Sequence, residues 1–172
     1  APRHQHRVRF RARYEPGELF AVAYSGGRET SRTALSSADA RTGVHLRAES
    51  SELVADGDDL AFVHVELSDA QGTVEMLVED RIDLSITGPA ELIGFASAAP
   101  ATEESFLTPS QQTYQGRALA ILRSTGDEGV IEVTAHSQVS GTATIELLAR
   151  SARYDHPDAP ASASIPALGE TR

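Results

Sequence analysis

The chain has 172 residues, of which 40% are hydrophobic, 23% charged and 5% aromatic, and its formal net charge is −10. This balance is typical of a globular protein and excludes a disordered or fibrous chain. Cysteine is absent, which excludes disulfide scaffolds, cysteine-ligated zinc, iron–sulfur clusters and thiol nucleophiles and is compatible with a cytoplasmic or a secreted protein.

The charge is unevenly distributed. All fifteen basic residues are arginine; nine of them lie in residues 1–47 with four acids, whereas residues 48–172 carry six arginines and twenty-one acids. The acidic body argues against a nucleic-acid partner, because affinity for phosphates needs clustered positive charge; only the N-terminal segment could serve that role, and no nucleic-acid partner is expected. No apolar run approaches the roughly 20 residues that span a bilayer, so we expect no membrane span. The first residue is not Met, which favours a mature product or a piece of a longer protein.

The first 43 residues predict three short strands in a meander. Arginines alternate with apolar residues over residues 7–14, which is the period of a strand. Two further strand candidates, 19–24 and 28–35, follow turns that contain glycine. Three strands cannot enclose a core. We therefore expect residues 1–43 to be the C-terminal strands of a preceding β-sandwich domain.

The middle of the chain has a period of two residues. Apolar side chains occupy alternate positions in residues 61–67, 82–86, 131–135 and 143–147, with Val63 and Ile131 on the inward phase. Short turn signals separate about seven strand candidates, the number that an immunoglobulin-type sandwich requires. The sequence predicts an all-β chain with an immunoglobulin-like antiparallel sandwich over residues 44–150. Residues 151–172, rich in proline and small residues, are predicted to be an extended tail or linker.

These segments resemble bacterial β-galactosidases of glycoside hydrolase family two. Residues 14–24 and 27–29 are similar to the last strands of the domain that follows the catalytic barrel in those enzymes. Residues 55–72, which contain Asp-Gly-Asp-Asp-Leu, and residues 116–124, which contain Gly-Arg-Ala-Leu-Ala-Ile, are similar to their C-terminal sandwich. The resemblance covers residues 8–148, and the similar pieces occur in the same order.

The resemblance implies a non-catalytic accessory region of a bacterial glycoside hydrolase, with a packing, orienting or quaternary role. Its partners would be the catalytic and other domains of the parent enzyme, together with oligomer contacts. Enzymes of this family hydrolyse glycosides with two glutamates carried by a TIM barrel, and no barrel pattern is present in these residues. We therefore expect no catalytic residue in this chain.

Two groups of carboxylates are the candidates for acid–base or metal chemistry. Asp56, Asp58 and Asp59 lie in a turn that enters a strand, where hard cations such as Ca²⁺ could find oxygen ligands. The turn lacks the residue order of a calcium loop, so aspartates that bond to the backbone are favoured. If their segment is extended, Glu103 and Glu104 point to opposite faces and cannot both contact a sugar.

The remaining polar residues give no strong site. His4 and His6 could face one metal, but no third ligand is evident, and a basic terminal arm is favoured. Ser25 and Ser140 lack a nucleophile-elbow pattern. His64 and His136 lie on the polar phase of their strands and are expected to be exposed. Tyr114 and Tyr154 could stack on a sugar, but ordinary surface tyrosines are favoured. No metal and no cofactor is expected.

Two other classes of protein remain open at this stage. A bacterial adhesin repeat of the invasin type has a comparable pattern of alternating strand residues and a turn, here Val63, Val65 and Leu67 followed by Asp69 and Gly72. A carbohydrate-binding module would use the same sandwich architecture with exposed aromatic side chains.

Overall fold

The computed structural model describes residues 8–39 and 41–152, and the regular elements in these residues are β-strands. No helix in this part of the chain is long and apolar enough to cross a membrane. The strands are β1 (Glu18–Ser25), β2 (Arg28–Ser36), β3 (Gly43–Ala48), β4 (Glu52–Val54), β5 (Leu60–Ser68), β6 (Arg81–Thr87), β7 (Ala90–Ala96), β8 (Ser110–Gln112), β9 (Arg117–Ser124), β10 (Gly129–Ser137) and β11 (Gly141–Arg150). The predicted all-β class is confirmed.

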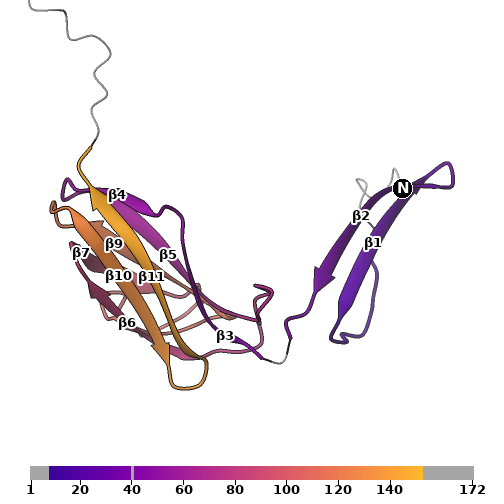
Figure 1. The fold of residues 1–172 in the computed structure, drawn as a ribbon. Helices are drawn as coiled ribbons and strands as arrows, with labels where there is room; N and C mark the ends of the chain where they lie inside the picture. The colour runs from indigo at the N-terminus through magenta and orange to yellow at the C-terminus, as the bar shows by residue number, and fades with distance from the viewer. Residues whose placement is uncertain (1–7, 40, 153–172) are drawn as a thin grey trace, which may run out of the picture.

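Nine of these strands form two layers that enclose one core (Figure 1). One sheet has five strands in the order β4-β11-β10-β6-β8, and the other has four in the order β3-β5-β9-β7. Neighbouring strands are antiparallel, except that β4 pairs in parallel with β11. This arrangement confirms the predicted antiparallel sandwich.

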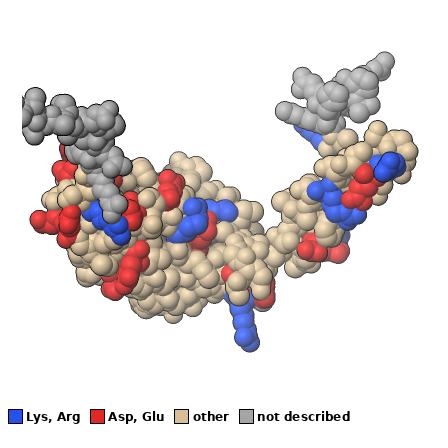
Figure 2. Space-filling view, turned by 45° about the horizontal axis from the view of Figure 1, so that its top comes forward, with Lys and Arg blue, Asp and Glu red and all other residues tan. Residues whose placement is uncertain are grey.

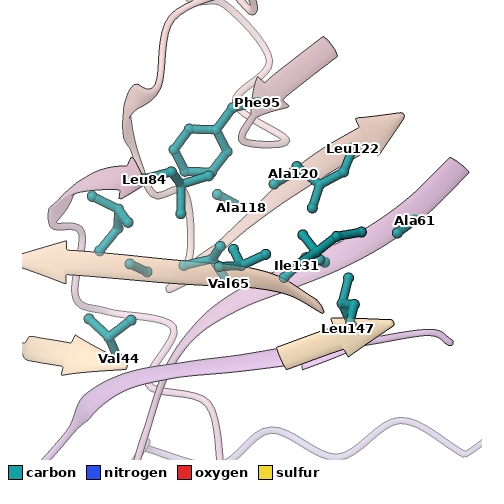
Figure 3. Close-up of a cluster of buried hydrophobic side chains, with 14 of the residues drawn as sticks. Val44, Ala61, Val65, Leu84, Phe95, Ala118, Ala120, Leu122, Ile131 and Leu147 are labelled. Atoms are coloured by element: carbon teal, nitrogen blue, oxygen red, sulfur yellow. The ribbon is translucent and has the colours of Figure 1, made fainter. Parts of the chain in front are cut away.

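The core contains the inward-facing residues of both sheets. Val63 on β5 and Ile131 on β10 are completely buried, as the alternating pattern predicts. Ile131 lies among alanine, valine, leucine and phenylalanine side chains that come from both layers (Figure 3). The buried residues are Val44, Leu53, Ala61, Val63, Val65, Leu67, Ile82, Leu84, Phe95, Ala118, Ala120, Leu122, Ile131, Val133, Ala135, Leu147 and Ala149. Aliphatic burial of this kind is the main favourable contribution to the stability of the sandwich.

The structure has more strands than the sequence indicates. Nine strands lie in residues 43–150, where about seven were expected from the alternating pattern. The edge strands β4 and β8 contain only three residues each. Three residues are too few to establish a period, so a pattern of alternation does not reveal strands of this length.

The N-terminal segment forms a two-stranded hairpin, and not the three-stranded meander expected from the sequence. Strands β1 and β2 pair with each other and with no other strand among the described residues (Figure 1). Residues 8–15 are not in a strand, and Val8 and Phe10 are exposed. An alternating pattern makes a strand only where a second strand offers backbone partners, and residues 8–15 have none among the described residues. The strand that the sequence predicts over residues 7–14 is therefore not formed by residues 8–14.

Candidate functional site

The aspartates of the loop between β4 and β5 bind the backbone of their own loop. Asp56 Oδ1 accepts hydrogen bonds from the N–H groups of Asp58 and Asp59 at 2.9 and 2.8 Å. These bonds hold the pKa of Asp56 below its ordinary value. Asp59 Oδ2 accepts a bond from the N–H of Val54 at 2.7 Å. The loop is thus organised by side-chain contacts to the backbone, as expected for Asx turns.

The two glutamates between β7 and β8 have different surroundings. The segment that carries them is not a strand, so the extended geometry considered for Glu103 and Glu104 does not occur. Glu104 forms an ion pair with Arg81 of β6 and accepts a hydrogen bond from the N–H of Gln112 at 3.1 Å. The Arg81 contact is the largest cause of the lowered pKa of Glu104. Glu103 is exposed.

The histidine, serine and tyrosine candidates do not come together. His64 Nε2 lies 3.0 Å from Glu49 Oε1, and His136 Nδ1 lies 2.8 Å from Thr142 Oγ1, on different sheets. Tyr114 is half-buried, and Ser25 is exposed in the hairpin. No group of three or more His, Asp or Glu side chains in residues 8–39 and 41–152 is arranged to hold a metal ion. His4, His6 and Tyr154 lie outside the described residues.

An open groove of about 900 Å³ lies beside the end of β11. The charged side chains that line it contact each other or the backbone. Arg150 Nη2 lies 3.4 Å from Glu52 Oε1, and Glu128 Oε1 accepts a hydrogen bond from the N–H of Ser151 at 2.8 Å. The bonds from Ser151 are the main reason for the lowered pKa of Glu128. The groove therefore presents charged groups that already have partners within the chain.

The sequence did not indicate a buried network around Asp80. The hydroxyl groups of Ser137 and Ser140 donate hydrogen bonds to Asp80 Oδ2, and Ser137 is buried. Burial raises the pKa of Asp80, whereas the hydrogen bonds from Ser137 and Ser140, with smaller contributions from backbone N–H groups, lower it by more in total. The net result is a pKa below the ordinary value. Thr113 Oγ1 accepts the N–H of Asp80 at 2.8 Å. The network joins the start of β6 to the turn between β10 and β11.

Asp69 is a buried residue of the sandwich that binds the segment connecting the hairpin to the sandwich. It is only 3% exposed, and its carboxylate accepts three backbone N–H groups. Two belong to its own turn, from Gln71 at 3.0 Å and Thr73 at 2.8 Å. The third comes from Asp39, in the segment that leads from β2 to β3, at 2.9 Å. Asp69 therefore attaches the connecting segment to the sandwich.

The bonds to Asp69 depend on its ionisation. The N–H of Asp39 is the largest cause of the lowered pKa of Asp69, and the turn amides add to it. A carboxylate whose pKa is lower in the folded state stabilises the fold at pH values above its unfolded pKa. That stabilisation is lost as the pH falls through the folded pKa. The attachment should therefore hold at neutral pH and weaken in acid, below about pH 4.

Asp69→Asn should release the connecting segment. The amide of asparagine offers one acceptor oxygen in place of two; since two turn amides bind Oδ1 and only Asp39 binds Oδ2, we expect the turn to keep the oxygen and Asp39 to lose its partner. We expect faster hydrogen exchange at the N–H of Asp39, measured at neutral pH by NMR or mass spectrometry. Asp58→Asn is the matched control, because Asp58 is exposed in the loop at the opposite end of β5. Unchanged exchange at Asp39 in the Asp69 variant would show that the attachment does not depend on this carboxylate.

Comparison with known proteins covers most of the chain. The sequence profile of the glycoside hydrolase family 2 C-terminal domain 5 matches residues 44–146. The β-galactosidase BoGH2A of Bacteroides ovatus is 25% identical over 142 residues, which are 83% of this chain and 17% of that protein. The chain therefore spans about one sixth of the length of this curated relative.

Two solved structures have the same fold. A glycosyl hydrolase family 2 member from Bacteroides cellulosilyticus is 35% identical, with a TM-score of 0.77, over 81% of this chain and 18% of that chain. A β-glycosidase from Bacteroides vulgatus is 18% identical, with a TM-score of 0.70, over 78% of this chain and 18% of that chain. The profile match covers more than half of the chain, and the first of these structures agrees with it in both sequence and fold. The chain belongs to glycoside hydrolase family 2, as a C-terminal region that carries domain 5 of that family.

Proposed function

We propose that this region is non-catalytic and that it packs against and orients other domains of a β-galactosidase-like parent enzyme. The observation that carries the proposal is the match to a C-terminal domain that makes up about one sixth of its relatives, and the state of the carboxylates agrees with it. In the described residues, each carboxyl group with a shifted pKa has that pKa lowered: Glu29, Asp56, Asp69, Asp80, Glu104 and Glu128. A glycosidase needs one carboxyl group whose pKa is raised, so that it is protonated and can donate to the leaving oxygen.

The chain should therefore not hydrolyse glycosides. We expect no turnover of a chromogenic β-galactoside or β-glucuronide by purified chain, because ionised carboxylates cannot act as the general acid. The measurement is absorbance of the released phenol over a range of pH. Turnover that survives repurification and disappears in Glu104→Gln would contradict the proposal, whereas turnover that persists in that variant would indicate a contaminating enzyme.

The division of the chain is part of the same proposal: residues 1–43 belong to the end of a preceding β-sandwich, residues 44–150 form the C-terminal sandwich, and residues 151–172 form a tail or linker. Support comes from the hairpin, which carries large apolar side chains on both faces. Leu19 and Leu35 share one face, and Phe20 and Tyr24 lie on the other. They are 48–71% exposed. An isolated hairpin is marginally stable, and further strands would cover these residues.

A chain that begins at Val44 tests this division. We expect it to keep the melting temperature and the amide protection of the sandwich, because strand pairing does not connect β1 or β2 to either of its sheets. Circular dichroism and hydrogen exchange measure the two quantities. A loss of protection throughout β3 to β11 would instead make the hairpin a structural part of the sandwich.

A further inference from the structure

The two sheets of the sandwich have outer faces of different composition. On the four-stranded sheet, Phe62 of β5 lies opposite Ile121 of β9, and Ile121 in turn lies opposite Gly94 of β7. In the next row, Leu119 of β9 lies opposite Ala96 of β7. We call these five residues the apolar outer face. They alternate with buried residues such as Val63 and Ala120, so they point away from the core, and they are half-buried.

The outer face of the five-stranded sheet is polar. Thr134 of β10 lies opposite Ser85 of β6 and Thr144 of β11, and the two threonine hydroxyls are 3.0 Å apart. Glu132 lies between Thr87 and Glu146 in the same way. A sheet face in contact with water normally carries such residues, whereas a strand that is covered on both sides is apolar at successive positions. Residues 118–122, Ala-Leu-Ala-Ile-Leu, have this second pattern.

Polar side chains border the apolar outer face; several of them contact one another, and Arg47 of β3, opposite His64, is exposed. His64 contacts Glu49 at 3.0 Å, and Arg123 Nε donates to Glu91 Oε1 at 2.9 Å. Arg117 Nε lies 3.6 Å from Glu66 Oε1. Figure 2 shows blue arginines beside red acids at several places on the sandwich. An apolar centre whose polar border carries both basic and acidic side chains fits an apolar protein surface better than a polyanion or a polycation.

The position of the face in the chain indicates which surface covers it. Relatives are five to six times longer than the part that this chain matches, and the match is to a C-terminal domain. The connecting segment held by Asp69 enters the sandwich at β3, which is the edge strand of the same sheet. At the opposite edge, the carbonyl of Phe106 accepts the N–H of Phe95 on β7, and Phe106 is 53% exposed. A domain that precedes β3 is thus joined to the chain beside this face.

We propose that the apolar outer face of the four-stranded sheet docks on a preceding domain of the same polypeptide through a neutral, apolar contact. This inference rests on the proposed packing role and gives that role a location. Gly94 leaves the side chain of Ile121 accessible to another domain. A Cβ at position 94 would lie 3.9 Å from Ile121 Cδ1 and would cover part of the isoleucine side chain. A partner side chain can reach Ile121 there.

The test uses the full-length parent protein and hydroxyl-radical footprinting. We expect Leu119 and Ile121 to be oxidised severalfold more slowly in the wild-type parent than in the isolated chain, relative to Val139, which is 84% exposed in the turn between β10 and β11 and serves as the internal reference. Ile121→Lys should raise the oxidation of Phe62 and Leu119 severalfold, because a charge at the centre of the contact separates the two domains. Thr134→Lys is the matched control, since Thr134 is half-buried on a central strand of the other outer face.

Each result decides the question. Equal oxidation of Leu119, relative to Val139, in the wild-type parent and in the isolated chain would overturn the proposal, because the face would be uncovered. Protection that is lost on dilution, together with a change in oligomeric state, would overturn it in favour of contact between two copies. If Ile121→Lys also exposes the core residue Val63, the milder Ile121→Ala replaces it, and unchanged oxidation of Phe62 in that variant overturns the proposal. Glycoside turnover by the isolated chain would refute the non-catalytic role without changing the footprint.

Discussion

Ile131→Asp should unfold the sandwich. Ile131 is completely buried on β10, a central strand of the five-stranded sheet, and lies opposite Leu147 of β11. The substitution removes buried methyl groups and places an unpaired carboxylate in the core, at a combined cost of about 4 kcal/mol or more. Since domains are stable by only about 5 to 15 kcal/mol, most of the folded population should be lost or its melting temperature should fall steeply. Thermal unfolding followed by circular dichroism measures the effect.

Glu132→Lys is the control at the adjacent position of the same strand. Glu132 is exposed and lies directly opposite Glu146 of β11, so a lysine replaces a repulsive pair with an attractive one. We expect a change within about 0.5 kcal/mol. If Glu132→Lys unfolds the protein and Ile131→Asp does not, the two faces of β10 are exchanged, as they would be after a shift of one residue in register.

Gly88→Ala should have the second largest effect, although it adds one methyl group. Gly88 lies in the turn that leads from β6 in one sheet to β7 in the other, and its φ is +93°. A Cβ at this position would lie 2.1 Å from the carbonyl oxygen of Val130 and 3.1 Å from the Cα of Ile131. These are backbone atoms of β10, which cannot move without disturbing the pairing of that strand. We expect a loss of about 3 kcal/mol or more in the free energy of unfolding.

Gly141→Ala separates the two causes of that loss. Gly141 has a φ of +85°, but a Cβ there would have no atom within 4 Å. Its substitution should cost only the strain of a left-handed backbone, about 1 kcal/mol. Chemical denaturation of the two variants gives both values. Equal losses would show that backbone strain alone decides the effect and that Val130 can move away from the new methyl group.

The period of two residues was sufficient to predict the long strands and their orientation. Val63 and Ile131 are buried because every second position in their strands is apolar and faces one core. The same reasoning failed for residues 8–14, whose pattern is as regular but which have no paired strand among the described residues. Alternation describes what a strand would bury, and the existence of the strand depends on a backbone partner that the local sequence does not encode.

The contacts of the candidate site were only partly predictable. A turn at Asp69 could be recognised from Asp-Ala-Gln-Gly, but its bond to Asp39 joins residues thirty positions apart and has no local signal. The apolar outer face did have a signal, since residues 118–122 are apolar in both phases. Such a run is also typical of a strand that is buried on both sides within one domain, and only the sheet order shows that one side faces outward.

The short strands at the margins of the five-stranded sheet have a consequence for a chain that folds among other β-rich domains. The long strands β11, β10 and β6 would each be templates for a foreign strand if their edges were open. Instead, β4 pairs with the last three residues of β11 and β8 with the first three residues of β6, so each margin of the sheet ends in a strand of only three residues. A three-residue strand offers too few backbone groups to hold an incoming chain in register. The outermost strands of the five-stranded sheet thus give a neighbouring β-rich domain little opportunity to add or exchange a strand there.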